Sequence, residues 1–162
     1  MKYHPVTEKI KSLLFENNCW FETFEHQPVR TSEESAKVRP EYALHQGAKA
    51  LIVRIKKSNS DKRFVMLVFP ANFRFNNHKV KALLGIKDIR FATEQEISSI
   101  TQGIKPGGVP PFGNLFGLEV IADPKLFKNE KIVFSAGDRR FSLAMKAEDY
   151  RDLVKPQVAC IV

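Results

Sequence analysis

The chain has 162 residues and a formal net charge of +8 at pH 7, and 43% of its residues are hydrophobic and 27% charged. This composition is typical of a folded globular protein and excludes a disordered chain. The longest uninterrupted apolar run, residues 64–69, is far too short to span a membrane. The first residues lack the apolar stretch of a secretory signal. We therefore expect a single cytoplasmic domain over residues 1–162.

Positive charge is concentrated in the middle of the sequence. Residues 30–90 contain 14 lysine and arginine residues against 5 aspartate and glutamate residues, whereas the rest of the chain contains 12 against 13. A concentrated positive field attracts polyanions such as nucleic acids. A solvated basic face that only improves solubility accounts for the charge equally well, so the charge alone does not decide between these functions.

The first part of the chain is predicted to form a helix, a strand and a second helix. Apolar residues at helical spacing predict a helix over residues 7–18, with Thr7 as its N-cap. Residues 20–26 alternate in the manner of an edge strand. Thr31 stands three residues before a glutamate, which is the spacing of a capping box and predicts a short helix over residues 31–39.

The middle of the chain contains the strongest strand signal. Residues 48–57 and 62–70 are rich in β-branched and aromatic residues, and the turn-forming sequence Ser-Asn-Ser-Asp joins them, which predicts a β-hairpin. A helix is predicted over residues 76–85, a short strand over residues 89–92 and another helix over residues 93–102.

Three short strands and a last helix are predicted after residue 113. The strands cover residues 118–123, 131–138 and 139–146, with a turn at Gly137 and Asp138, and the helix covers residues 147–155 before a frayed tail. Strands and helices mix without strict alternation and without an internal repeat. The sequence therefore predicts an α/β or α+β fold in which helices surround a mixed β-sheet.

Residues 103–113, "GIKPGGVPPFG", contain four glycines and three prolines. Neither a helix nor a central strand tolerates that mixture. Closely spaced glycines let a backbone approach a ligand, and prolines make the approach rigid. Backbone N–H groups held in this way can stabilise an oxyanion. The segment lacks the patterns of nucleotide-phosphate loops. A stiff surface turn without a ligand is the alternative.

No residue pattern indicates a protein nucleophile or a metal centre. Cys19 and Cys160 lack a neighbouring base and metal-ligand spacing, and the four histidines are scattered, so we expect no metal and no cofactor. His26 precedes a proline at a strand end and could line a pocket, although a local structural role explains it as well. Lys49 begins an apolar strand and could present a fixed ammonium group to a phosphate, although most lysines are simply solvated.

Four segments of the sequence resemble a known family. "HQPVRTSEESAKVR", "GAKALIVRI", "KPGGVPPFG" and "VFSAGDRRFSL" are similar in order and spacing to the YbaK/prolyl-tRNA synthetase-associated (INS-like) editing domain. The resemblance covers about residues 26–155. Its most specific element is the segment 107–111, which matches a G-x-x-x-P motif, and Lys49 falls where that family has its functional lysine.

The resemblance implies a free-standing aminoacyl-tRNA deacylase that hydrolyses the ester of a mischarged tRNA, with alanyl- or cysteinyl-tRNA(Pro) as the expected substrate. It implies that tRNA is a partner, that an aminoacyl-tRNA synthetase is a further candidate partner, and that a substrate-assisted water is the nucleophile. The implied catalytic residues are Lys49, Gly107, Gly108 and Pro111, and the implied substrate-binding residues are Thr31, Ser32, Val109, Pro110, Phe112, Ser135 and Gly137. A non-catalytic tRNA- or nucleotide-binding module on the same fold is the alternative, and a synthetase-associated adaptor is a weaker one.

Overall fold

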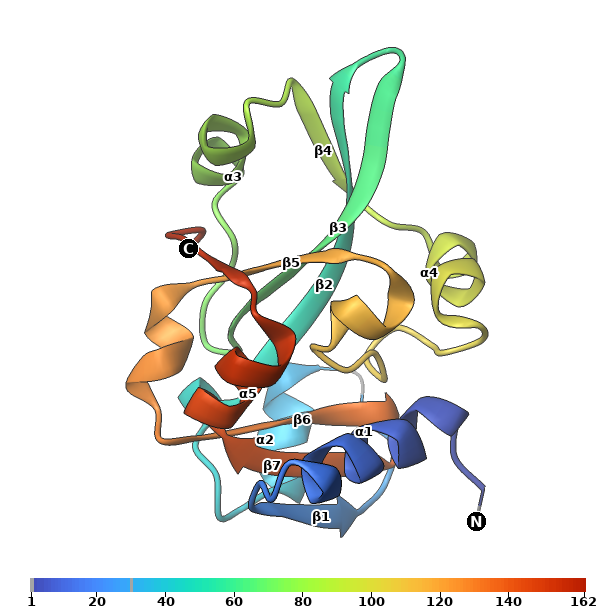
Figure 1. The fold of residues 1–162 in the computed structure, drawn as a ribbon, viewed down its shortest axis with the longest axis vertical. Coiled ribbons are helices and arrows are strands. Elements are labelled where there is room, and N and C mark those ends of the chain that lie inside the picture. Colours follow the sequence, from blue (N-terminus) through green and yellow to red (C-terminus); the bar gives the residue numbers. More distant parts are fainter. Residues whose placement is uncertain (1, 30) are drawn as a thin grey trace.

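The computed structural model describes residues 2–29 and 31–162, and it contains two β-sheets with helices around them (Figure 1). The side chain of Ser32 lies outside the described part of the structure. The helices are α1 (Pro5–Glu16), α2 (Ser32–Val38), α3 (Asn77–Leu84), α4 (Glu94–Thr101) and α5 (Ala147–Val154). Three short 3-10 turns, Leu44–Gln46, Gly113–Phe116 and Pro124–Lys128, connect other elements. The predicted class, a mixture of helices and strands around a mixed sheet, is confirmed.

The first sheet is antiparallel and has the strand order β1-β7-β6. Its strands are β1 (Phe21–Glu25), β6 (Lys131–Asp138) and β7 (Phe141–Lys146). Helix α1 packs against β6, and α5 continues directly from β7. This sheet forms the lower half of the molecule in Figure 1.

The second sheet is mixed and has the strand order β4-β2-β3-β5-β8. Its strands are β2 (Ala48–Ser58), β3 (Asp61–Pro70), β4 (Asp88–Phe91), β5 (Glu119–Ala122) and β8 (Gln157–Val158). β2 is antiparallel to both β3 and β4, whereas β5 is parallel to β3 and β8 is parallel to β5. The predicted hairpin is therefore confirmed, and its long strands form the centre of this sheet.

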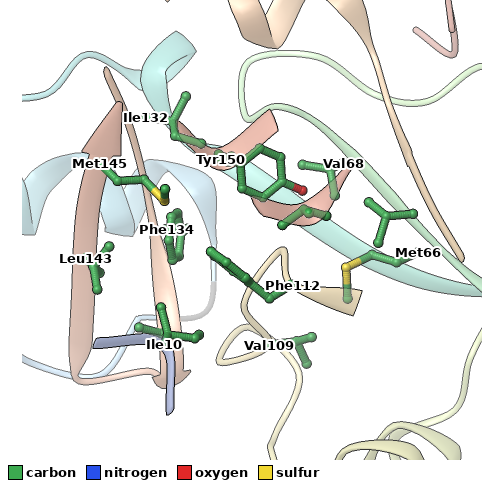
Figure 2. Packing of buried hydrophobic residues seen from close by; sticks show 14 of the residues in the cluster. Ile10, Met66, Val68, Val109, Phe112, Ile132, Phe134, Leu143, Met145 and Tyr150 are labelled. Atoms are coloured by element: carbon green, nitrogen blue, oxygen red, sulfur yellow. The ribbon is translucent and has the colours of Figure 1, made fainter. Parts of the chain in front are cut away.

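Hydrophobic residues from both sheets and from α1 and α5 form the main core (Figure 2). Phe112 is fully buried there, with its ring centroid 5.7 Å from that of Phe134 and 5.6 Å from that of Tyr150. A second cluster fills the other face of the five-stranded sheet, under α3, and includes Val80 and Ile161. Burial of this much apolar surface is the main force that holds the two sheets together.

Three local predictions are wrong. Helix α1 begins at Pro5, and the His4 Nδ1 atom accepts a hydrogen bond from the Val6 N–H (3.1 Å), so His4 is the N-cap rather than Thr7. Proline at the first helical position fixes this start, since its φ is already helical and it has no N–H to satisfy. The hydroxyl of Thr7 is buried instead and donates to the Ala136 carbonyl oxygen (2.6 Å).

The predicted turn at Gly137 and Asp138 is part of strand β6, and the chain reverses at Arg139 and Arg140. A β-bulge between Ser135 and Asp138 displaces the turn. Gly137 has a φ of +104° in this bulge, a backbone angle that residues with a side chain rarely adopt.

The predicted frayed tail is ordered. β8 pairs with β5, and the N–H groups of Ile161 and Val162 donate to the buried Asp123 carboxylate (2.8 and 3.1 Å). The Asn76 N–H in turn donates to the Ile161 carbonyl oxygen (2.6 Å). The tail therefore joins β5 to the start of α3.

Candidate active site

A cavity of about 760 Å³ opens between the two sheets. Its walls come from the start of α2, the first residues of β2, the segment 71–74, the loop residues Pro106, Gly107 and Val109, β6 and Arg139. Five of the residues singled out in the sequence line it: Thr31, Lys49, Gly107, Val109 and Ser135. Segments that are far apart in the chain thus meet at one hollow, which is large enough for the end of a nucleic acid strand or a small molecule.

Lys49 extends from the part of β2 that only one other strand covers. β3 pairs with the whole length of β2, but β4 pairs only with residues 53–56. The outer edge of β2 at residues 48–51 lines the cavity instead. The side chain of Lys49 is half-buried, and among the described residues its ammonium group has no hydrogen bond and no ion pair. An ammonium group without a protein anion is available to an anion from a ligand.

The loop of residues 103–113 presents Gly107 and Val109 to the cavity. The N–H of Gly107 has no hydrogen-bond partner among the described residues, whereas the N–H of Gly108 donates to the Lys105 carbonyl oxygen (2.9 Å). Gly107 has a φ of +87°, which favours glycine. Of these two neighbouring glycines, Gly107 is therefore the one whose N–H has no partner in the described part of the chain.

Several contacts fix the loop from behind. The Arg139 Nε donates to the Pro106 carbonyl oxygen (2.6 Å), and the Gly137 N–H donates to the Gly108 carbonyl oxygen (2.8 Å). The buried Tyr150 hydroxyl donates to the Pro111 carbonyl oxygen (2.6 Å). These bonds connect one loop to β6, to the following turn and to α5, so its backbone is held in position on several sides.

Other predicted site residues lie behind the cavity wall. Gly108, Pro110, Pro111 and Phe112 are buried and do not line the cavity. Gly137 faces α1, because a Cβ atom added to it would lie 2.7 Å from Val6 Cγ1. Their positions fit anchoring of the loop better than contact with a ligand. The side chain of Ser32 is outside the described part.

A buried arginine in the cavity wall was missed by the sequence analysis. Arg39 is 6% exposed, its Nε donates to the Ser142 hydroxyl (2.9 Å) and its Nη2 donates to the Ser135 hydroxyl (3.4 Å). It has no carboxylate partner among the described residues. Burial lowers the pKa of Arg39 to about 10, so the side chain is still charged at neutral pH. In the sequence, Arg39 is simply an arginine before a proline. The one feature that pointed to a function is its position in the segment 26–39, which carries part of the family resemblance.

His26 completes this buried network. In the neutral ring, its Nδ1 donates to the Gln27 carbonyl oxygen (2.8 Å) and its Nε2 accepts from the Ser142 hydroxyl (2.6 Å). This arrangement requires the neutral ring, and burial lowers the pKa of His26, with the charge of Arg39 acting in the same direction. His26 thus orients the hydroxyl that supports Arg39 and does not act as a free base.

The rim of the cavity is basic and partly aromatic. Phe73 is 38% exposed, and the Lys125 Nζ lies 5.7 Å from the centroid of its ring. Exposed Arg74 follows in the same segment and also lines the cavity, which has Glu33 as its one acidic lining residue among those described. Lysine and arginine next to an exposed ring form the kind of surface on which unpaired nucleotides bind.

Neither cysteine lies in this cavity. Burial raises the pKa of the Cys19 thiol, which makes it a poorer nucleophile, and Cys160 is exposed in the tail. In the described part of the chain, no three histidine, cysteine, aspartate or glutamate residues are grouped so that they could hold a metal ion. None of the described helices is long and apolar enough to cross a membrane.

Comparison with known proteins gives a consistent result. Residues 26–153 match the family described as the aminoacyl-tRNA editing domain. The chain is 28% identical over 152 residues to the multifunctional Ser/Thr-tRNA deacylase ProXp-y of Escherichia coli (strain K12). The aligned residues make up 93% of this chain and 89% of that protein. The chain is also 29% identical over 116 residues to a proline–tRNA ligase of Burkholderia ambifaria (strain MC40-6). The aligned residues make up 72% of this chain but 20% of the ligase.

A solved structure has the same fold. It is described as that of a candidate trans-editing enzyme for prolyl-tRNA synthetase, and it matches with a TM-score of 0.78 and 20% identity over 99% of this chain and 98% of the other. The family match and the deacylase relative, rather than this structure, confirm the expected family and the expected class of enzyme, an aminoacyl-tRNA deacylase. The cavity at Lys49 is lined largely by the segments in which the sequence resembles this family. The chain belongs to the aminoacyl-tRNA editing domain family.

Proposed function

We propose that the chain hydrolyses the ester between a wrongly attached small amino acid and the 3′ end of a tRNA, and that it does so in the cavity at Lys49. The observation that carries this proposal is that two residues lining one cavity have hydrogen-bond donors without a protein acceptor. The Lys49 ammonium and the Gly107 N–H both belong to lining residues, and neither has a partner among the described residues. Donors held without protein acceptors are suited to a ligand that brings its own negative oxygens.

In this proposal the side chains position the substrate and water is the nucleophile. Lys49 binds a phosphate or ribose oxygen of the terminal nucleotide, and Gly107 donates to the ester carbonyl oxygen as charge develops on it. A water molecule, held by the free hydroxyl of the terminal ribose, attacks the carbonyl carbon. The bond between the carbonyl carbon and the esterified ribose oxygen then breaks. That oxygen takes a proton from the attacking water, and the free amino acid and the tRNA leave.

Gly108, Pro110, Pro111 and Phe112 act through the loop in this proposal. Their buried positions hold Gly107 and Val109 at the cavity. Val109 and Thr31 then limit the space beside the ester, so that a small side chain fits and a large one does not.

The amino acid that is removed is inferred from the polar wall. The resemblance implies alanine or cysteine on tRNA(Pro), whereas the Escherichia coli relative is described as a Ser/Thr-tRNA deacylase. The Ser135 hydroxyl lines the cavity and accepts from buried Arg39. Because a hydroxyl can hydrogen-bond another hydroxyl, we infer that serine is removed faster than alanine or cysteine of similar size.

A panel of tRNAs charged with serine, threonine, alanine, cysteine and proline tests the proposal, with loss of the labelled amino acid as the readout. Lys49→Ala is expected to lower kcat/KM on the best substrate about a hundredfold, and Lys9→Ala, which changes an exposed lysine on α1, is the matched control. No ester loss from any tRNA, or full activity of Lys49→Ala, contradicts the mechanism. Retained tRNA binding without turnover supports the non-catalytic binding module instead.

We further propose that residues 1–162 act as one cytoplasmic domain that works on tRNA after a synthetase releases it. The likeness to one part of a proline–tRNA ligase supports association with a synthetase. Co-purification of a synthetase with the tagged chain tests this association, and Lys49→Ala is expected to leave it unchanged.

A further inference from the structure

The hairpin of β2 and β3 projects beyond its neighbours in the sheet (Figure 1). β4 pairs only with residues 53–56 of β2, and β5 pairs only with residues 65–68 of β3. Beyond these points the hairpin has no further strand beside it among the described residues. We call residues 56–63 and Lys87 the arm, since the Lys87 N–H donates to the Lys56 carbonyl oxygen (2.8 Å) and fixes Lys87 next to the hairpin.

The arm contains much of the positive charge found in the middle of the sequence. Its basic residues are Lys56, Lys57, Lys62, Arg63 and Lys87, and its acidic residue is Asp61. Arg63 forms an ion pair with Glu119 (3.4 Å). The four lysines have no carboxylate within ion-pair distance in the described part of the chain.

The acidic residue opposite Lys56 on the neighbouring strand is already engaged. Asp88 lies opposite Lys56 in the register of β2 and β4, but its carboxylate pairs with Arg54 (3.3 Å). The positive charge of the arm is therefore left for something outside the chain. A polyanion gains free energy at such a surface because it releases its own counterions.

The strand register places the lysines where they repel one another. Lys56 lies directly opposite Lys62 in the antiparallel pair, and like charges in this position are destabilising. Lys57 is the extra residue of a β-bulge between Lys56 and Ser58, which turns its side chain out of the regular alternation. The repulsion between these lysines destabilises the exposed tip of the hairpin. Their presence there is therefore consistent with a role in binding rather than in folding.

A hollow of about 340 Å³ lies at the arm. It is lined by Lys56, Ser58, Asn59, Lys87 and Asp88. Two ammonium groups, a hydroxyl and an amide are donors that suit phosphate oxygens, and they meet here on one surface. The hollow has the donors to receive a backbone phosphate, and its one carboxylate, that of Asp88, is paired with Arg54.

One strand connects this surface to the active site. Lys49 in the cavity and Lys57 in the arm lie on β2, and at about 3.3 Å per residue they are roughly 26 Å apart. Because β2 is hydrogen-bonded to β3 along this length, the separation is fixed. A substrate that contacts both points must extend over this distance, and the lysines at both ends favour a polyanion.

We propose that the arm binds backbone phosphates of the base-paired acceptor stem of the tRNA whose aminoacylated 3′ end occupies the cavity. This inference rests on the proposed function for the second contact point. It assigns the basic middle of the sequence to two places, the cavity that holds the unpaired end and the arm that holds the duplex. Protection of an exposed strand edge by lysines is the alternative role for the same residues.

The test compares two substrates that carry the same amino acid. One is the complete tRNA, and the other is a short oligonucleotide of the unpaired 3′ end, which cannot reach the arm. Lys57→Glu/Lys62→Glu is expected to raise KM for the tRNA about tenfold or more and to leave kcat/KM for the oligonucleotide unchanged. The dependence of KM on salt is expected to become shallower for the tRNA only, because fewer phosphates are then neutralised.

Lys2→Glu/Lys9→Glu is the matched control, because it makes the same charge change at exposed residues at the opposite end of the molecule. Equal losses on both substrates, equal losses in the control, or no loss on the tRNA overturn the proposal and favour edge protection. Lys57→Gln/Lys62→Gln, with urea unfolding of each variant, separates a folding defect from a binding defect.

Direct binding keeps the inference testable if the unaltered chain hydrolyses nothing. Fluorescence anisotropy of a labelled, uncharged acceptor-stem hairpin RNA measures the arm without any turnover. The arm variants are expected to weaken this binding about tenfold, and an unchanged Kd contradicts the proposal. Absence of turnover with intact arm-dependent binding contradicts the deacylase mechanism and leaves the arm in place.

Discussion

The Tyr150 hydroxyl donates a 2.6 Å hydrogen bond to the carbonyl oxygen of Pro111, and both groups are buried. This bond joins the last helix to the loop that lines the cavity, across 39 positions of the chain. Proline 111 cannot be held through its own nitrogen, since it has no N–H, so its carbonyl oxygen is the available backbone contact.

Tyr150→Phe is expected to remove this bond without changing the shape of the core. An unpaired buried carbonyl costs about 1–3 kcal/mol, and urea unfolding is expected to show a loss in that range. We also expect kcat to fall more than KM rises, because the ring still packs against Phe112 while the loop becomes less fixed. Full activity with reduced stability would assign the bond to folding alone.

Gly137 tests how the β6 bulge is packed against α1. A Cβ atom there would lie 2.7 Å from Val6 Cγ1 and 2.8 Å from Thr7 Oγ1, in addition to the strain of a φ of +104°. Gly137→Ala is expected to lower the free energy of unfolding by about 3 kcal/mol or more. Gly103 has the same φ of +104° but no atom within 4 Å of an added Cβ, so Gly103→Ala is expected to cost about 1–2 kcal/mol. Equal effects of the two substitutions would show that strain alone decides.

His26 gives the fold a dependence on pH near neutrality. Burial lowers the pKa of His26 in the folded state, so the unfolded chain binds the proton more readily. Stability is therefore present above the ordinary histidine pKa near 6.5 and is lost as the pH falls from 7 towards 5. The hydrogen bond to the Gln27 carbonyl oxygen and, less strongly, the Asp138 carboxylate oppose this lowering of the pKa without reversing it.

Urea unfolding of the unaltered chain and of His26→Gln between pH 7.5 and 5 measures this effect. We expect the unaltered chain to lose more stability over this range than the variant does. The carboxylates contribute little there, because the pKa values of Asp138 and Glu96 are also lowered, that of Glu96 to about 2. Parallel curves for the two proteins would contradict a half-buried His26 that is neutral in the folded state.

The parts of the fold that the sequence predicts correctly are those set by neighbours in the chain. The long hairpin follows from two β-branched runs and a turn cluster. Helix α4 lies where the sequence predicts a helix, and Thr93 and Glu96 bond each other's backbone in a capping box at its start. The composition of "GIKPGGVPPFG" predicts a loop because it fits no regular element, and residues 103–112 form no helix or strand; their contact with a ligand stays a prediction.

What the sequence does not predict depends on contacts between distant positions. Arg39 reaches Ser135 and Ser142, which are 96 and 103 positions away, and no local pattern marks a buried arginine. The tail is ordered because the Asp123 carboxylate accepts from the Ile161 N–H, 38 positions away. The division of the loop between lining and anchoring residues likewise depends on β6 and α5, which follow it in the chain.

Phe73 provides the sharpest test of how the terminal nucleotides bind. Its ring is 38% exposed at the rim of the cavity, next to Lys125 and Arg74, and an unpaired base can stack on such a ring. Stacking on an aromatic side chain contributes about 1–3 kcal/mol per base, so Phe73→Ala is expected to raise KM for both the tRNA and the short oligonucleotide about tenfold. Phe73→Trp is expected to retain or improve KM, since a larger ring still stacks.

Phe91 is the matched control, because it is 61% exposed but does not line the cavity. Phe91→Ala is expected to leave KM for both substrates unchanged. The effect of Phe73→Ala on the short oligonucleotide also separates this residue from the arm, whose variants are expected to spare that substrate. An unchanged KM for Phe73→Ala, or an equal increase in Phe91→Ala, would mean that the ring at the rim does not contact the bound 3′ end.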